Sequence, residues 1–112
     1  MIILSSVSPD AAQAALLAFR YAATAAAMDL AVEVHAVSGC TVRLLARSGA
    51  GDALRAQVRQ ATEHGASLYV CPLALAELNL RAEDLIDDVC GVRGAASLLG
   101  AGFAPGARFI SF

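Results

Sequence analysis

Short apolar runs alternate along this chain with stretches whose apolar residues recur at helical spacing. Short runs rich in apolar and β-branched residues are typical of strands. They predict strands at residues 1–5, 30–37, 66–70, 89–92 and 108–112. The stretches between them predict helices at residues 11–27, 52–64, 72–78 and 94–102. Residues 41–46 fit either a short strand or a helical turn.

The first predicted helix carries a start signal and two distinct faces. Ser8-Pro9-Asp10 provides a candidate N-cap, a proline for the first helical position and an acid in the first turn. Its predicted core stripe is Leu16, Phe19, Ala23 and Ala27.

Leu17, Tyr21 and Thr24 share another face of this helix, which is either covered by a partner subunit or a mixed surface. In the helix at 52–64, the stripe Leu54, Val58 and Ala61 is the predicted buried side. Arg55 and Arg59 point away from that stripe, and we interpret them as a solvated face in preference to an anion site.

Strands joined by helical crossovers predict a parallel sheet, because parallel neighbours cannot be linked by a tight hairpin. We therefore expect one domain over residues 1–112, an α/β/α three-layer sandwich with a mainly parallel sheet of about five strands. A chain of 112 residues is long enough to bury a core of its own.

The composition adds an expectation of self-association. Hydrophobic residues make up 58% of the chain and charged residues only 16%, against about 25% in an ordinary soluble domain. Part of the excess is alanine, which favours helices. We still expect apolar surface to be buried between subunits.

Charge and targeting signals exclude several partners. The formal net charge is −2, every basic residue is an arginine, and no basic run could neutralise a row of phosphates, so nucleic acid is not an expected partner. The N-terminus lacks the basic and apolar regions of a signal peptide, and no apolar stretch reaches membrane length. We expect a cytoplasmic protein without a membrane partner, in which three cysteines remain thiols.

Cys71 is the leading candidate for chemistry. It ends the apolar run at 66–70 and precedes Pro72, which favours Cys71 as the N-cap of the next helix. The partial positive charge of a helix start stabilises the thiolate, the nucleophilic form of cysteine. The alternative is a buried structural cysteine, which is a common fate of this residue.

Other polar groups are expected beside Cys71, because ligands of parallel sheets bind outside the carboxyl ends of the strands. All three thiols fall near predicted strand ends and should share one rim. An anionic sulfur species could be held there by hydroxyl groups and a cation. The candidate binding residues are Ser6, Ser8, Gly39, Cys40, Cys90 and Arg93.

Three stretches resemble the DsrE/DsrF/DsrH-like family of small sulfur-handling proteins: Tyr69 to Leu78, Glu83 to Val89, and Gly94-Ala95-Ala96. The most specific feature is a cysteine that closes the third strand, followed by a short helix, an acidic turn and a Gly-Ala-Ala helix start. The resemblance implies a compact α/β/α sandwich that assembles as a trimer or hexamer. It also implies that Cys71 accepts sulfur as a persulfide.

The sequence departs from the family pattern at two cysteines. Cys40 stands where an acidic residue is common, and Cys90 where valine or glutamate is commoner. Each is either a resolving thiol or a filler of a small apolar space. His35, inside a strand, is interpreted as hydrogen-bonded or at an interface, and His64 as favourable to the helix C-terminus.

Two functions remain open. One is a sulfur carrier or sulfurtransferase that takes sulfur from a donor protein on Cys71 and passes it to an acceptor thiol. The other is a non-catalytic oligomeric module that binds a small anion or protein, with Cys71 as a structural residue. Cysteine gaps are too long for a zinc motif, and Gly49-Ala50-Gly51 is too incomplete for a nucleotide fingerprint, so we expect no metal and no cofactor.

Overall fold

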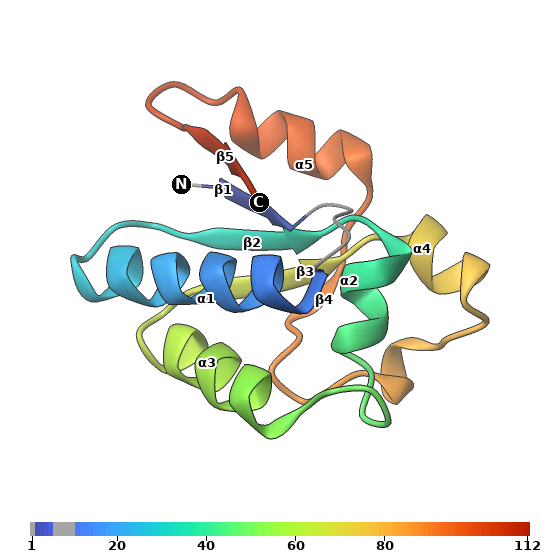
Figure 1. Ribbon diagram of the computed structural model, residues 1–112. Coiled ribbons are helices and arrows are strands. Elements are labelled where there is room, and N and C mark those ends of the chain that lie inside the picture. The colour runs from blue at the N-terminus through green and yellow to red at the C-terminus, as the bar shows by residue number, and fades with distance from the viewer. Residues whose placement is uncertain (1, 6–10) are drawn as a thin grey trace.

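A computed structural model of the protein describes residues 2–5 and 11–112, and its ribbon is shown in Figure 1. The elements are β1 (Ile2–Ser5), α1 (Ala11–Ala27), β2 (Glu33–Ala36), α2 (Gly39–Leu44), α3 (Asp52–Glu63), β3 (Ser67–Val70), α4 (Pro72–Glu77), the 3₁₀ helix η1 (Ala82–Asp84), β4 (Gly91–Val92), α5 (Ala95–Gly102) and β5 (Phe109–Ser111). The predicted α/β class is confirmed. The ambiguous segment at 41–46 belongs mainly to a helix, α2, and the predicted helix start at residues 8–10 lies outside the described residues.

The described strands pair in the order β4-β3-β2-β1-β5, and every pairing is parallel, as predicted. The centre consists of three strands of four residues each, β1, β2 and β3. The edges are shorter, because β4 has two residues and β5 has three. Because the strands are parallel, the carboxyl ends of all of them point in one direction, toward α2 and α4 (Figure 1).

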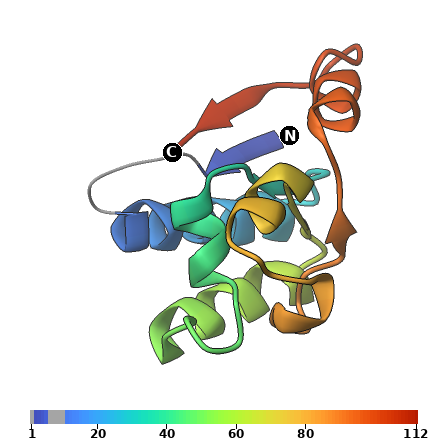
Figure 2. The same ribbon diagram turned by 90° about the vertical axis from the view of Figure 1, so that its right-hand side faces the viewer.

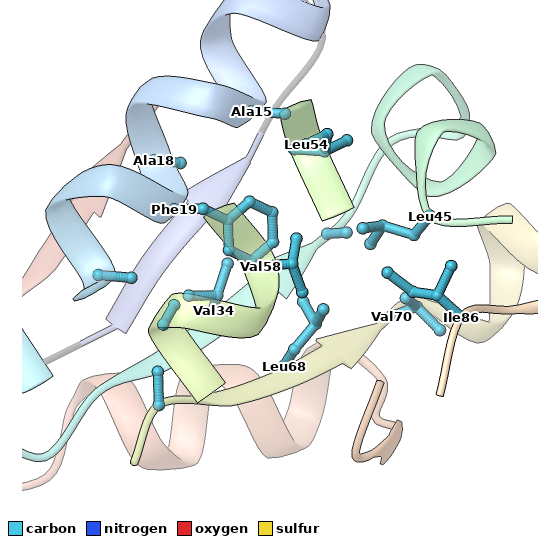
Figure 3. Close-up of a cluster of buried hydrophobic side chains, with 14 of the residues drawn as sticks. Ala15, Ala18, Phe19, Val34, Leu45, Leu54, Val58, Leu68, Val70 and Ile86 are labelled. Atoms are coloured by element: carbon cyan, nitrogen blue, oxygen red, sulfur yellow. The ribbon is translucent and has the colours of Figure 1, made fainter. Parts of the chain in front are cut away.

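The main core lies between the sheet and the helices α1 and α3. Side chains alternate between the two faces of a strand, so Val34 on β2 and Leu68 on β3 point toward these helices, where Phe19 and Val58 meet them (Figure 3). The predicted stripe of α3, which is Leu54, Val58 and Ala61, is buried as expected.

The stripe predicted for α1 is only partly right. Phe19 and Ala23 are buried, Leu16 is half-buried, and Ala27 is exposed. The buried face is instead extended by alanines, which are Ala15, Ala18, Ala22, Ala25 and Ala26. Small side chains let α1 lie close to both the sheet and α3, so the contact face is wider than one stripe of large residues. Leu17, Tyr21 and Thr24 are exposed on the remaining face.

Helix α5 lies on the opposite side of the sheet from α1 and α3 (Figure 2). A β-carbon added to Gly102 would stand 1.7 Å from Phe109 Cζ, so α5 rests closely on β5 at this point. Most of α5 is exposed, including Leu99, and so is Phe103 at its C-cap. The helix therefore joins β4 at one edge of the sheet to β5 at the other.

Candidate functional site

Cys71 occupies the position that the sequence predicted, between β3 and α4. Its amide donates to the carbonyl oxygen of Ala36 at 3.0 Å, which continues the pairing of β3 with β2 by one residue. Cys71 has an extended backbone and is the N-cap of α4, and Pro72 follows at the first helical position. The side chain is half-buried and packs against the edge of the core. The thiol is thus fixed at the carboxyl edge of the sheet.

The start of α4 is not capped by a side chain. Cys71 Sγ makes no capping hydrogen bond, and Pro72 has no amide hydrogen. The amides of Leu73 and Ala74 belong to the first turn of α4, where a helix leaves its N–H groups without intrahelical acceptors. They are the donors nearest in sequence to the thiol.

Gly39 and Cys40 begin α2 at the same edge of the sheet. Ser38 caps this helix through its hydroxyl, which accepts from the Thr41 amide at 3.3 Å. A β-carbon on Gly39 would lie 3.7 Å from Leu78, so the start of α2 packs against the end of α4. Cys40 is exposed. Ser6 and Ser8, the predicted hydroxyl donors, lie outside the described residues.

Cys90 does not lie at the rim with Cys71, and this part of the prediction is wrong. Its amide donates to the carbonyl oxygen of Leu68 at 2.7 Å, and Tyr69 is paired with Gly91. Cys90 therefore precedes β4 at its amino end. The strand starts later than its apolar pattern suggested, so the exposed thiol is three register positions behind Cys71.

Arg93 has its backbone at the predicted rim, but its guanidinium group points back across the sheet. The Arg93 amide donates to the carbonyl oxygen of Val70 at 3.0 Å, which is next to Cys71 in sequence. The guanidinium group lies 4.0 Å from the ring centre of Tyr69 and donates to Glu33 Oε1 at 3.1 Å. Glu33 is the first residue of β2, so the cation is held away from the carboxyl edge.

The sheet face opposite α1 carries a polar cluster that was not predicted from the sequence. It consists of Glu33, His35, Tyr69 and Arg93. The rings of His35 and Tyr69 are 5.3 Å apart. His35 is 2% exposed, and its Nε2 atom has no hydrogen-bond partner; Glu33 Oε2 is 3.9 Å away. Of the two roles expected for His35, a hydrogen bond is not found at this atom, and a place at an interface between subunits stays a prediction.

The alternation of polar and apolar residues in β2 could have predicted part of this cluster. Glu33 and His35 alternate with the apolar residues Val32, Val34 and Ala36, so one face of the strand is apolar and the other polar. Their partners on β3 and beyond β4 could not be read from the same pattern.

Burial is the largest influence on His35 and lowers its pKa below the usual 6.5, because the charged imidazolium loses its hydration. The positive charge of Arg93 also lowers this pKa. The carboxylate of Glu33 opposes both effects. Burial dominates, so the neutral imidazole is favoured in the folded protein.

Within residues 2–5 and 11–112, no three His, Cys, Asp or Glu side chains are grouped so as to hold a metal ion. None of the helices in the same part of the chain is long and apolar enough to cross a membrane.

The fold and the placement of Cys71 define an α/β protein with a parallel sheet and a cysteine at its carboxyl edge. The chain belongs to the DsrE/DsrF-like family, whose model matches residues 1–110. This confirms the resemblance found in the sequence. No curated protein matches the chain.

Solved structures share this fold at low sequence identity. The YchN protein of E. coli is 16% identical with a TM-score of 0.81, and the match covers 99% of this chain and 97% of YchN. A protein of unknown function from Methanobacterium thermoautotrophicum is 18% identical with a TM-score of 0.74, covering 99% and 97%. A conserved protein of unknown function from Bacteroides thetaiotaomicron is 9% identical with a TM-score of 0.71, covering 99% and 93%.

Proposed function

We propose that this protein is a sulfur carrier that holds sulfur as a persulfide on Cys71 and passes it to an acceptor thiol. The observation that carries the proposal is the position of Cys71, half-buried at the carboxyl edge of β3 with an uncapped helix start behind it. Membership of the DsrE/DsrF-like family is consistent with a role in sulfur relay.

The two steps exchange sulfur without net oxidation. The Cys71 thiolate attacks the outer sulfur of a donor persulfide, so a new S–S bond forms and the donor leaves as a thiolate. An acceptor thiolate then attacks the outer sulfur on Cys71 and carries it away. Cys71 leaves as a thiolate and is ready for another cycle.

The start of α4 suits the loaded state better than the empty one. Cys71 Sγ itself makes no capping hydrogen bond. A persulfide is longer by one S–S bond of about 2 Å, and its outer sulfur is an anion. The amides of Leu73 and Ala74 would then donate to it, as helix starts do to other anions.

Arg93 would donate to the persulfide together with these amides only after its ion pair with Glu33 breaks. Its backbone is adjacent to the Cys71 edge, and an arginine side chain can turn toward either end of the sheet. We propose that Glu33 holds the cation while Cys71 is empty, and that the anionic persulfide competes for it.

Loading with sulfur tests the assignment of Cys71. The protein is incubated with polysulfide, and intact mass is measured for the wild type and for Cys71→Ser, Cys40→Ser and Cys90→Ser. Serine is a favoured N-cap, so Cys71→Ser should fold. We expect only Cys71→Ser to lose the added sulfur. If Cys71→Ser retains it at the original level, the non-catalytic binding module becomes the better account.

The role of Arg93 has its own test. Arg93→Gln should slow sulfur loading about tenfold or more, the scale of one hydrogen bond to a charged group. Glu33→Gln should speed loading, because it frees the cation without changing the size of the side chain. Arg20→Gln, on the exposed side of α1, is the matched control and should change nothing. Equal rates in Arg93→Gln and the wild type would remove Arg93 from the site.

We further propose that the protein associates with itself. Tyr21, Met28, Leu30 and Ile110 are exposed at 53%, 67%, 45% and 36% and line an apolar hollow of about 250 Å³ between α1 and β5. A surface of this kind is typical of a contact between subunits. The trimer or hexamer expected from the family would cover it.

A further inference from the structure

A small hollow on the surface is lined mainly by charged side chains and is separate from the Cys71 edge. It has a volume of about 60 Å³, whereas a single water needs about 10–15 Å³ by the same measure. Its lining residues are Arg47, Arg55, Arg59, Ile86, Asp87 and Asp88. They come from α3, from the segment after α2 and from the segment before β4.

The charges in the hollow do not cancel. Three guanidinium groups and two carboxylates give a net charge of +1. The charge of Arg47 is balanced, because Arg47 forms an ion pair with Asp87. Its guanidinium group also donates to the carbonyl oxygen of Glu83 at 3.3 Å. Asp88 accepts from the Thr62 hydroxyl at 3.4 Å. The surplus positive charge therefore belongs to the two arginines of α3.

Arg55 and Arg59 both line the hollow and have donors without acceptors there. They are four residues apart, so they lie on one side of α3, where like charges repel. One amino group of Arg55 donates to the carbonyl oxygen of Arg47 at 2.8 Å, which leaves its charge uncompensated. Among the described residues, Arg59 forms no ion pair or side-chain hydrogen bond, even with Glu63 one turn later.

We propose that this hollow binds one small tetrahedral oxyanion, sulfate or phosphate, between Arg55 and Arg59. Guanidinium groups present paired N–H donors that match such oxygens. A doubly charged oxyanion would relieve the repulsion between the two arginines. The sequence had favoured a solvated face for these arginines, because it could not show that Arg47 and Asp87 close the hollow beside them.

The test is calorimetric titration of the whole protein with sodium sulfate, and in a second arm with sodium phosphate, at constant ionic strength. We expect saturable binding at one site per chain. Sodium chloride at the same ionic strength should give none. Saturation by only one of the two oxyanions supports the site and identifies its ligand.

Two substitutions should act in opposite directions. Arg59→Gln should weaken binding about tenfold or more, because it removes the cation without an existing partner; glutamine is a good helix former, so α3 should persist. Asp88→Asn should tighten binding, because it removes a repelling carboxylate and keeps an oxygen for Thr62. Arg20→Gln on α1 is the matched control and should bind as the wild type does.

Several outcomes would overturn the proposal. They are an equal response to chloride, no saturation with either oxyanion, unchanged affinity in Arg59→Gln, or weaker binding in Asp88→Asn. Circular dichroism of each variant shows whether the fold is retained. Because no cysteine takes part, the result is independent of sulfur loading on Cys71.

Discussion

His35 is a buried titratable side chain with an unpartnered nitrogen. An imidazole that is 2% exposed, with Nε2 lacking a hydrogen bond, loses hydration without full compensation. Its pKa is lowered in the folded protein, chiefly by burial. The unfolded chain therefore binds the proton more readily than the folded chain does.

This difference predicts that acid destabilises the fold through His35. Stability from the neutral imidazole is fully present above the unfolded pKa of about 6.5 and is lost as pH falls below it, by up to about 1.4 kcal/mol per pH unit. Urea unfolding near pH 8 and near pH 5 measures the effect. His35→Phe should reduce the loss, whereas His64→Gln serves as a control.

An identical loss of stability in His35→Phe and the wild type would contradict this assignment. The phenylalanine retains a ring against Tyr69, so a change in pH dependence would come from the lost titration. A change in the free energy of unfolding that is the same at all pH values would instead show that the substitution altered packing alone.

Helix α5 contains two glycines, and its packing against β5 requires glycine at only one of them. A β-carbon on Gly102 would overlap the ring of Phe109, whereas one on Gly100 would meet nothing within 4 Å. Gly102→Ala should therefore lower the free energy of unfolding by about 1–3 kcal/mol, as overpacking does. Gly100→Ala should raise it by about 0.5–1 kcal/mol, because alanine is the better helix former. Thermal unfolding of the pair compares them.

The contrast between these two glycines tests the packing of α5 on β5. Both lie in the same helix, so their intrinsic preferences are alike. Equal stabilisation by both substitutions would show that α5 does not rest on Phe109.

Local signals predicted the elements and the place of Cys71. The apolar run before Cys71 and the proline after it are adjacent in sequence, so the N-cap of α4 could be read directly. The start of β4 could not be predicted in this way, because it depends on the pairing of Cys90 with Leu68 on another strand. The direction of Arg93 depends on Glu33, 60 residues earlier in the chain.

The exposed apolar surface of the whole molecule predicts an assembly in solution. Light scattering should give a mass above that of one chain at micromolar concentration. Met28→Lys should lower this mass, because Met28 is 67% exposed beside the apolar hollow and a buried lysine charge is costly. Gln60→Lys, on an exposed polar face of α3, is the matched control. A monomer in the wild type would contradict the proposed self-association.

The central claim concerns which thiol receives sulfur, and the three cysteines of one chain allow a direct comparison. Cys40 and Cys90 are more exposed than Cys71, so accessibility alone would favour them. The decisive measurement is peptide mass spectrometry of the wild-type protein after brief loading with polysulfide and alkylation. The account predicts that the added sulfur is found on the peptide containing Cys71. Sulfur found only on Cys40 or Cys90, or spread in proportion to exposure, would contradict it.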